Sequence, residues 1–389
     1  MKFTTLSLAA TLAISSAFAG GDIIPVAEVS PAPVESMTTI GGKLTAYYIT
    51  NDNSDAYDMF STDGSQLGLA ATLDVSHKFT ENIVANFSAM GYANTNQTEI
   101  YDYLYGSSYF ESEANGAIFN VANITATFAD TTFVLGRQFL DTPMVGGMDW
   151  LLSQGSFEAY TAVNTSFENV TLVGSYIREY RPINAGDEWL TLTDINEGNN
   201  WTVGAAYDNK TLSGSLWYYN IDAGATLTGD KYTQVYLDGG YSFGVAKLEA
   251  QYANTAYDIL DDSNAYGAKL SGDVSSFSLM AAYAYIDGEV VGYIERDSLY
   301  TSSWNTIGAS KGNTFKVEAG TEFAGISATA SYAYYEYEQN IPEDEGHEAD
   351  LILGYNITED IDFNVVYSNT DYGVGDATNA LEVYANYKF

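Results

Sequence analysis

The feature that most constrains this chain is a two-residue alternation of apolar and polar side chains along most of its length. In AKLEAQYA, residues 246–253, every second side chain is apolar, and the intervening ones include Lys247 and Glu249. The same alternation occurs in residues 315–320 and, less regularly, in residues 361–367. A period of two with one apolar face indicates a β-strand. The chain is therefore predicted to contain many strands, each with an apolar and a polar face.

The connections between these segments alternate strictly between short and long. The short ones contain mainly Asn, Asp and Gly, which accept left-handed backbone dihedrals or cap their own backbone. Eight short connections lie around residues 80–82, 129–130, 167–169, 208–210, 243–244, 272–273, 324–325 and 358–360. Nine longer, polar ones lie near residues 51–65, 93–114, 139–153, 182–198, 222–230, 258–264, 287–313, 339–346 and 371–378. Eight plus nine connections predict about 18 strands.

Short turns at one end, long loops at the other and an even strand number describe an all-β, transmembrane antiparallel β-barrel, with short periplasmic turns and long extracellular loops. Lipid offers no hydrogen-bond partner to the backbone, so every strand must pair on both sides and the sheet must close. The chain ends inside a strand, LEVYANYKF at Leu381–Phe389, which an open sheet would leave as an edge. We therefore expect this strand to pair with the first one, near Ile40–Thr50.

A soluble all-β protein, such as a propeller or a sandwich array, is the alternative fold, with its apolar faces turned inwards. Propellers repeat a blade motif at roughly 40 to 50 residues, and the sequence contains no such repeat. Soluble cores also rarely leave whole polar faces, such as Lys247 with Glu249 or Lys316 with Glu318, on so many consecutive strands. The alternation therefore favours apolar side chains that face lipid and polar ones that face a lumen.

The N-terminus predicts export. Lys2 precedes an apolar run, Leu6–Ile14, and the Ala17–Ala19 segment matches a small-x-small cleavage pattern. We expect a signal peptide over residues 1–19, cleaved after Ala19, then a flexible periplasmic lead-in over 20–37 and the transmembrane barrel over 38–389. This organisation predicts a place in the bacterial outer membrane.

Charge and composition exclude several classes of protein. The chain has 14 Lys and Arg against 51 Asp and Glu, a net charge of −37, and no cysteine. So acidic a chain repels nucleic acid, and without cysteine it has neither disulfides nor a thiolate metal site. No cofactor is predicted. Acidic loop segments around 52–58, 261–262 and 343–345 could offer oxygen ligands to calcium, or bridge lipopolysaccharide through divalent ions, although solvated loop charge explains them as well.

Several features together resemble a known family. The signal peptide, the Pro-containing lead-in, the alternating strands, GRQFLDTP at Gly136–Pro143 and the terminal YKF resemble the Opr-type outer-membrane porins, closest to the major outer-membrane porins of Campylobacter-like bacteria. The similarity covers essentially the whole mature chain through loose motifs. It implies 18 strands, a homotrimer and a loop folded into the lumen. The final Phe389 looks like the signal that the barrel-assembly machinery reads.

An 18-stranded barrel is wide enough for an aqueous channel, and charges at its narrowest point would set selectivity. We predict passive diffusion of ions and small hydrophilic solutes, with a preference for cations because carboxylates are so abundant. Strand parity predicts a set of charged residues on the lumen face, each of which could instead be an ordinary solvated wall residue. They are Lys43, Lys247, Lys269, Lys316, Asp74, Asp238, Asp350, Asp362, Glu158, Glu249, Glu318 and Glu322.

The connection Phe139–Gly155 differs from the other long loops because it carries Met144, Trp150 and other apolar residues. A loop this apolar is unsuited to float in water, so we expect it to fold into the lumen. Asp141 and Asp149 would then narrow the pore, facing Arg137 or the wall lysines. Packing against a neighbouring subunit, or over the barrel mouth, is the alternative.

Two other functions compete with transport. A barrel hydrolase needs a serine beside a histidine, and neither His77 nor His347 has a serine or carboxylate at a recognisable spacing, so no enzyme activity is expected. A plugged structural or adhesive barrel would use its longest loops, residues 92–114 and 288–313, for binding. Single-channel conductance separates that alternative from a porin.

Overall fold

The structure is a computed structural model of the chain, and its description is confined to part of the sequence. The described residues are 37–52, 58–95, 110–111, 114–183, 185–191, 199–222, 229–306, 308, 310–338, 345–373 and 375–389. The predicted signal peptide and nearly all of the predicted lead-in lie outside them. No helix within the described ranges is long and apolar enough to cross a membrane.

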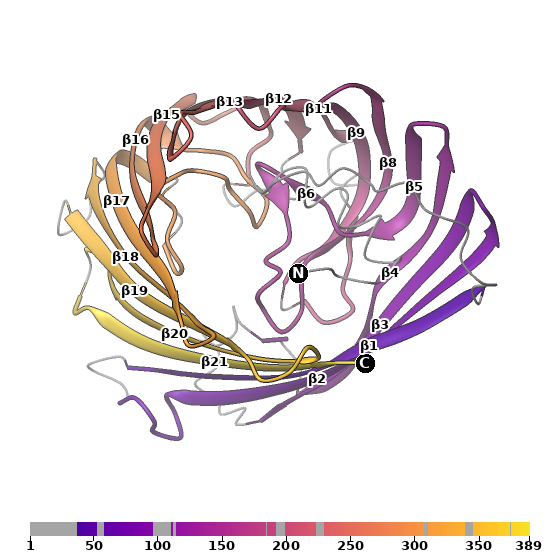
Figure 1. Ribbon diagram of the computed structural model, residues 1–389, viewed down its shortest axis with the longest axis horizontal. Helices are drawn as coiled ribbons and strands as arrows, with labels where there is room; N and C mark the ends of the chain where they lie inside the picture. Colours follow the sequence, from indigo (N-terminus) through magenta and orange to yellow (C-terminus); the bar gives the residue numbers. More distant parts are fainter. Residues whose placement is uncertain are drawn as a thin grey trace.

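Eighteen long antiparallel strands form the wall of a closed barrel (Figure 1). They are β1 (Thr38–Asn51), β2 (Ser65–Thr80), β3 (Ile83–Thr95), β4 (Asn115–Phe128), β5 (Thr131–Gln138), β8 (Ser156–Phe167), β9 (Val170–Arg181), β11 (Asn200–Asp208), β12 (Leu212–Ile221), β13 (Tyr232–Ser242), β14 (Ala246–Tyr257), β15 (Ser263–Val274), β16 (Phe277–Val290), β17 (Ser310–Phe323), β18 (Ile326–Tyr337), β19 (Glu345–Asn356), β20 (Ile361–Asp371) and β21 (Thr378–Lys388). The two-residue β10 (Leu190–Thr191) extends the sheet beside β9 at one rim. The predicted fold class and strand number are confirmed.

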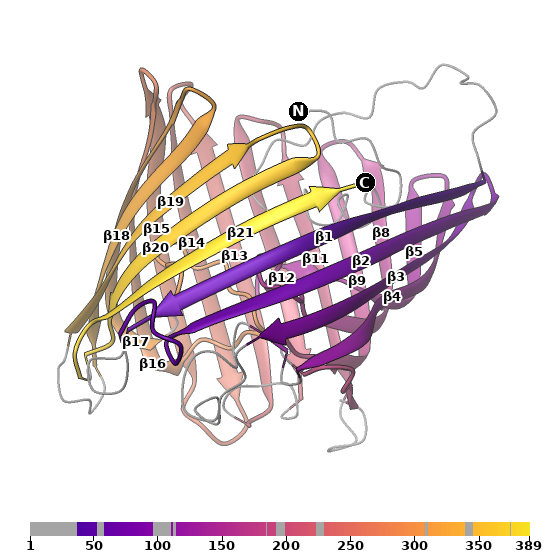
Figure 2. The same ribbon diagram turned by 90° about the horizontal axis from the view of Figure 1, so that it is seen from below.

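The barrel closes between its first and last strands, as the terminal segment predicted. β21 pairs with β1 in a continuous register from Lys43 opposite Lys388 to Asn51 opposite Ala380. Beyond the strand, the amide of Gly42 donates to the Phe389 carbonyl at 3.0 Å, and the Phe389 amide donates back at 3.1 Å. Figure 2 shows the two strands side by side across the seam. No edge strand remains between the two ends of the sheet.

Short turns and long connections alternate around the barrel as the sequence predicted. One turn lies elsewhere than expected: β15 continues to Val274, so the turn to β16 is Ser275–Ser276 and not residues 272–273. Ser275 takes a positive φ of 59°, and Asn169 and Lys210 in two other short turns take 60° and 70°. Such tight turns need one left-handed residue, which here is often not glycine.

The wall strands place apolar side chains outside and polar ones inside. On β14 and β15, Leu248 and Leu270 face outwards, and each keeps about half of its surface exposed (50% and 52%). The intervening Glu249 and Lys269 face the lumen and meet in an ion pair. Apolar side chains exposed in this regular way suit a hydrocarbon surrounding, which confirms the predicted inversion.

Two loops lie inside the barrel and give it an internal hydrophobic core. The first, residues 139–155, contains the hairpin of β6 (Asp141–Thr142) and β7 (Val145–Gly146), seen within the ring in Figure 1. The second, residues 291–306, follows β16, and Val145 and Ile294 form a parallel bridge between the two. Buried members of this core include Leu140, Met144, Val145, Ile294, Trp217, Tyr219 and Tyr232.

Candidate pore constriction

Loop 139–155 crosses the lumen because its apolar side chains find an apolar patch on the inner wall. Leu140, Met144 and Val145 are almost completely buried there. The amide of Met144 donates to the Tyr219 hydroxyl of β12 at 3.3 Å, so a wall side chain also holds the loop backbone. The loop therefore occupies lumen space, on the side of the barrel that includes β12.

Loop 291–306 follows the inner wall towards β21. The Tyr300 amide donates to Gln251 Oε1 at 2.9 Å, and further along Trp304 Nε1 donates to Glu382 Oε1 at 2.7 Å. From the sequence, this segment was predicted only to be one of the longest external loops. Its Ile294 and Leu299 are buried. Apolar residues in a long loop predicted the infolding of residues 139–155, and this segment carries the same kind of residue.

An ion pair joins the two infolded loops. Arg296 donates to Asp141, and the Gly146 amide donates to the Ile294 carbonyl at 3.2 Å beside it. Burial of the Asp141 carboxyl raises its pKa to about 6 although Arg296 opposes the shift. Asp141 therefore pairs with a loop arginine and not with Arg137 or a wall lysine, the partners predicted from the sequence.

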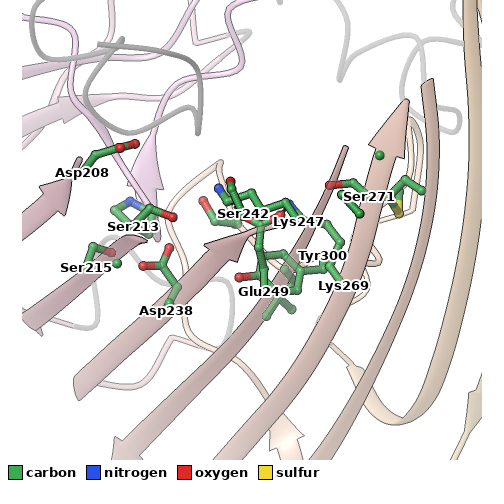
Figure 3. A pocket seen from close by; sticks show the side chains of 18 of the residues that line it. Asp208, Ser213, Ser215, Asp238, Ser242, Lys247, Glu249, Lys269, Ser271 and Tyr300 are labelled. Carbon is green, nitrogen blue, oxygen red and sulfur yellow. Dashed lines mark ion pairs between the residues drawn. The ribbon is translucent and has the colours of Figure 1, made fainter. Parts of the chain in front are cut away.

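Charged side chains of β14 and β15 face this loop pair. Glu249 accepts from Lys247 and from Lys269, with both N–O distances at 2.9 Å (Figure 3). The Lys269 ammonium also lies 4.4 Å from the centroid of the Tyr300 ring, a cation–π contact with the second loop. Two lysines thus share one carboxylate on this part of the wall.

These residues line a cavity of about 730 Å³ between the wall and the infolded loops. Asp238 and Ser215 lie on its wall side, as Figure 3 shows, and Arg296 and Asp297 reach it from the second loop. Burial raises the pKa of Asp297, whose carboxylate accepts from Ser302 at 2.6 Å. The cavity is polar and carries charges of both signs.

Other predicted lumen residues lie around the ring. Lys316 Nζ is 3.8 Å from Glu318 Oε2 and donates to the Ser302 carbonyl at 2.7 Å. Glu322 has the same parity near the end of β17 and is exposed. Lys43 on β1 lies within electrostatic range of Asp74, Asp362 and Asp149, the last of which comes from the first infolded loop.

Asp149 and Trp150 are the part of loop 139–155 that projects into open space. Asp149 is exposed, and Trp150 keeps 36% of its surface exposed. The Trp150 ring lies 5.8 Å from the ring of Trp304 between centroids, so aromatic side chains of both loops meet here. In the described part of the chain, Asp149 forms no ion pair.

Arg137 and Glu158 do not lie where the sequence analysis placed them. Arg137 has the parity of exposed Leu135 and packs over the Trp189 ring at 4.2 Å. Glu158, opposite Arg137 in the register and in line with exposed Tyr160, also faces outwards. The infolded loop packs against this part of the inner wall, so the side chains that face the lumen here are apolar. The side chains of opposite parity, Arg137 and Glu158, therefore face outwards.

The described residues contain no group of three or more His, Cys, Asp or Glu side chains that could hold a metal ion. Asp52 and Asp262, from two of the acidic loops, accept hydrogen bonds from the amides of Asn379 and Tyr257. The third acidic loop falls largely on residues outside the described ranges. His77 contacts the Thr38 hydroxyl at 2.8 Å, and His347 lies 3.8 Å from Asp371.

The fold is similar to solved structures of several bacterial proteins. OccAB3 of Acinetobacter baumannii aligns with a TM-score of 0.77 at 13% identity, over 90% of this chain and 99% of that one. A BenF-like porin from Pseudomonas fluorescens aligns at 0.75 with 12% identity, over 90% and 98%. The outer membrane protein opdK from Pseudomonas aeruginosa aligns at 0.74 with 12% identity, over 90% and 98%.

No family model matches the chain, and no curated protein matches it. At 12–13% identity, the likeness to the solved structures establishes the shared barrel fold.

Proposed function

We propose that this protein is an outer-membrane channel of the OprD/Occ kind, through which ions and small hydrophilic solutes diffuse passively. The observation that carries the proposal is a closed 18-strand barrel with an apolar outer face and a charged inner cavity. The similar structures include a porin and an outer membrane protein, which supports it. No catalytic step is part of this function.

Cation preference is the finer part of the proposal. The four basic side chains near the cavity have three carboxylate partners: Lys247 and Lys269 share Glu249, Arg296 pairs with Asp141, and Lys316 pairs with Glu318. Asp149 and Asp238 add negative charge that no ion pair balances in the described part of the chain. An excess of fixed negative charge along a pore raises the local concentration of cations.

Membership in a trimer, recognition of Phe389 by the assembly machinery and the nearer resemblance to the porins of Campylobacter-like bacteria remain predictions from the sequence. The strongest support for the family resemblance is the infolded Phe139–Gly155 loop, which begins within the GRQFLDTP segment. Cleavage after Ala19 is also a prediction.

A plugged structural barrel is the second candidate, because two loops and a hydrophobic core occupy part of the lumen. It predicts the same fold and location but no solute path. The exposed Asp149 and the cavity of about 730 Å³ favour the channel.

Planar-bilayer recordings of the purified protein in asymmetric KCl test the channel and its selectivity together. We expect discrete openings and a reversal potential of the sign that cation preference gives. Asp149→Asn should move that potential towards zero, whereas Asp360→Asn, in an exposed turn between β19 and β20, should not. Absence of conductance would favour the plugged barrel, and an unchanged potential in Asp149→Asn would remove this residue from the filter.

A further inference from the structure

Ile294 joins the second infolded loop to the middle of the first one. Its amide donates to the Met144 carbonyl at 3.0 Å, and its carbonyl accepts from the Gly146 amide at 3.2 Å. The Arg296 amide donates to the same carbonyl at 2.6 Å, which closes a tight turn around Glu295. Glu295 takes a positive φ of 55°, which is uncommon for a residue with a side chain, so contacts around the turn must hold it in place.

The turn directs its two charged side chains to the two ends of loop 139–155. Arg296 pairs with Asp141 near the beginning of that loop. Glu295 reaches the end of the loop, because a Cβ added at Gly155 would lie only 1.9 Å from Glu295 Oε2. The carboxyl group of Glu295 therefore lies directly against the Gly155 backbone. One turn thus holds both ends of the loop that crosses the lumen.

The upper end of strand β9 completes the surroundings of this carboxyl group. Glu295 Oε1 accepts from the Ile183 amide, two residues beyond β9, at 2.6 Å. The Tyr180 hydroxyl of β9 also forms a hydrogen bond with the carboxyl group. Both infolded loops and the wall therefore meet at one titratable side chain.

Negative charge is in excess around Glu295. The charged and titratable side chains that face it from the wall and from the segment 110–111 are Tyr180, Arg181 and Glu111. Arg181 is already paired with Glu111 at 3.2 Å. The first infolded loop contributes Asp141, whose partner is the arginine of the turn. Among the described residues, Glu295 has no ion pair of its own.

Burial raises the pKa of Glu295 from 4.5 to about 7, because the contacts from Tyr180, Ile183 and Arg181 offset only part of the cost of burying its charge. If the loop undocks, water reaches the carboxyl group and its pKa returns to the ordinary value. The docked loops therefore bind this proton more tightly than the undocked loops do. Their docking is strongest at low pH and weakens as the pH rises from about 4.5 to about 7.

We propose that Glu295 is a proton-dependent latch, which holds the two infolded loops together while its carboxyl group is neutral and loosens them once that group is ionised. Ionisation leaves two carboxylates, Glu295 and Glu111, beside the single guanidinium of Arg181. The loops should then undock more often, and the constriction should widen transiently, above neutral pH. This regulation of the pore rests on the proposed channel function, whereas the latch itself is a property of the folded chain.

Cysteine labelling tests the latch without a bilayer, because the chain has no cysteine of its own. Met144→Cys places one thiol in loop 139–155 at a position that is 0% exposed, so a maleimide reaches it only when the loop undocks. The labelling rate is compared between the chain with Glu295 and the chain with Glu295→Gln, both full-length and in detergent. Their ratio cancels the intrinsic pH dependence of the thiol. It should rise by up to about 10²-fold between about pH 5 and about pH 8.

Two further variants separate Glu295 from its neighbours. Asp141→Asn is the matched control, because it removes the other titratable carboxyl group of the loop pair; the rise should persist when both chains carry it. Gly155→Ala places a Cβ where the Glu295 carboxyl group lies. In that variant, labelling should be fast already at about pH 5 and should no longer depend on Glu295→Gln.

A ratio of labelling rates that does not change with pH would overturn the proposal, and so would a rise that Asp141→Asn abolishes. Bilayer recordings keep the test decisive if the cysteine variant folds poorly. The noise of the open current should grow from about pH 5 to about pH 8 in the wild type and not in Glu295→Gln, and equal noise in the two would count against the latch. Silent bilayers together with pH-dependent labelling would refute the channel function and support the latch.

Discussion

The buried Arg181 is the side chain whose removal we expect to disturb the constriction most. Arg181, the last residue of β9, and Glu111 are both completely buried and form an ion pair at 3.2 Å. Arg181 Nη2 also donates to Ser153 Oγ and to the Gln154 carbonyl, both at 2.6 Å. One guanidinium therefore ties the end of the infolded loop 139–155 to the wall.

Arg181→Met should destabilise this anchor strongly. It removes both loop contacts and, within the described residues, leaves Glu111 buried with the Gly186 amide, at 2.6 Å, as its remaining donor. Breaking a buried ion pair from one side typically costs about 3–5 kcal/mol. If that cost falls on the docked loop, the population of undocked loops rises by about 10²- to 10⁴-fold, since each 1.4 kcal/mol is a factor of ten.

Single-channel recording should detect the undocked loops as larger and more frequent fluctuations of the open current. Denaturant unfolding in detergent measures any loss of stability of the whole barrel. Arg178→Met is the matched control, because Arg178 lies on the same strand, is 42% exposed and has one ion pair to Glu158 at 3.6 Å. It should behave like the wild type. Glu111→Gln combined with Arg181→Met should recover part of the loss, because neither member of this ion pair is then left as an unpaired charge. The reasoning fails if Arg181→Met and Arg178→Met are indistinguishable in both assays.

Three further predictions follow from the same structure. The pKa of Asp141 is raised to about 6 from an ordinary 3.8, so its charge disappears as the pH falls through 6; cation preference in bilayers should fall over that range in the wild type and not in Asp141→Asn. The folded protein binds this proton more tightly than the unfolded chain does. The carboxyl therefore contributes stability at low pH that is lost as the pH rises from about 4 to 6. A difference in unfolding free energy between wild type and Asp141→Asn that does not change with pH over this range would contradict this. Tyr219→Phe removes the acceptor of the buried Met144 amide, at a cost of about 1–3 kcal/mol, and should increase current noise without changing the barrel's circular dichroism. Gly204→Val should lower the unfolding temperature, because a Cβ there would lie 2.3 Å from the buried Trp217 ring, and overpacking of this kind costs about 1–3 kcal/mol. Gly239→Val in β13, where an added Cβ has no atom nearer than 3.9 Å, is the control for a general effect of replacing glycine.

The barrel was predictable because every wall strand must alternate apolar and polar side chains and must pair on both sides. The alternation that places Lys247 and Glu249 inside and Leu248 outside repeats around the ring, and the turn chemistry separates the strands. The seam at β1 and β21 followed from the same requirement, since an unpaired Leu381–Phe389 strand has no partner in lipid.

The arrangement inside the barrel was less predictable, because there the apolar side chains face inwards. Phe157 and Val173 belong to the wall strands β8 and β9, yet they pack in the lumen core against the infolded loop. A parity rule that sends apolar residues to lipid therefore misplaces their neighbour Glu158. The pairing of Asp141 with Arg296 depends on two loops that are more than 150 residues apart in the chain (|i−j| = 155), and no local pattern reports such a contact.

The seam has a consequence for biogenesis. Thr45 and Asn386 hydrogen-bond across it although 341 positions separate them along the polypeptide. Contacts between such remote partners form late, because a very long segment must first be brought to order. A nascent molecule that is truncated near its C-terminus can therefore assemble most of its wall and still be unable to seal it. The wall of such a barrel therefore stays open until its last strand has paired with its first.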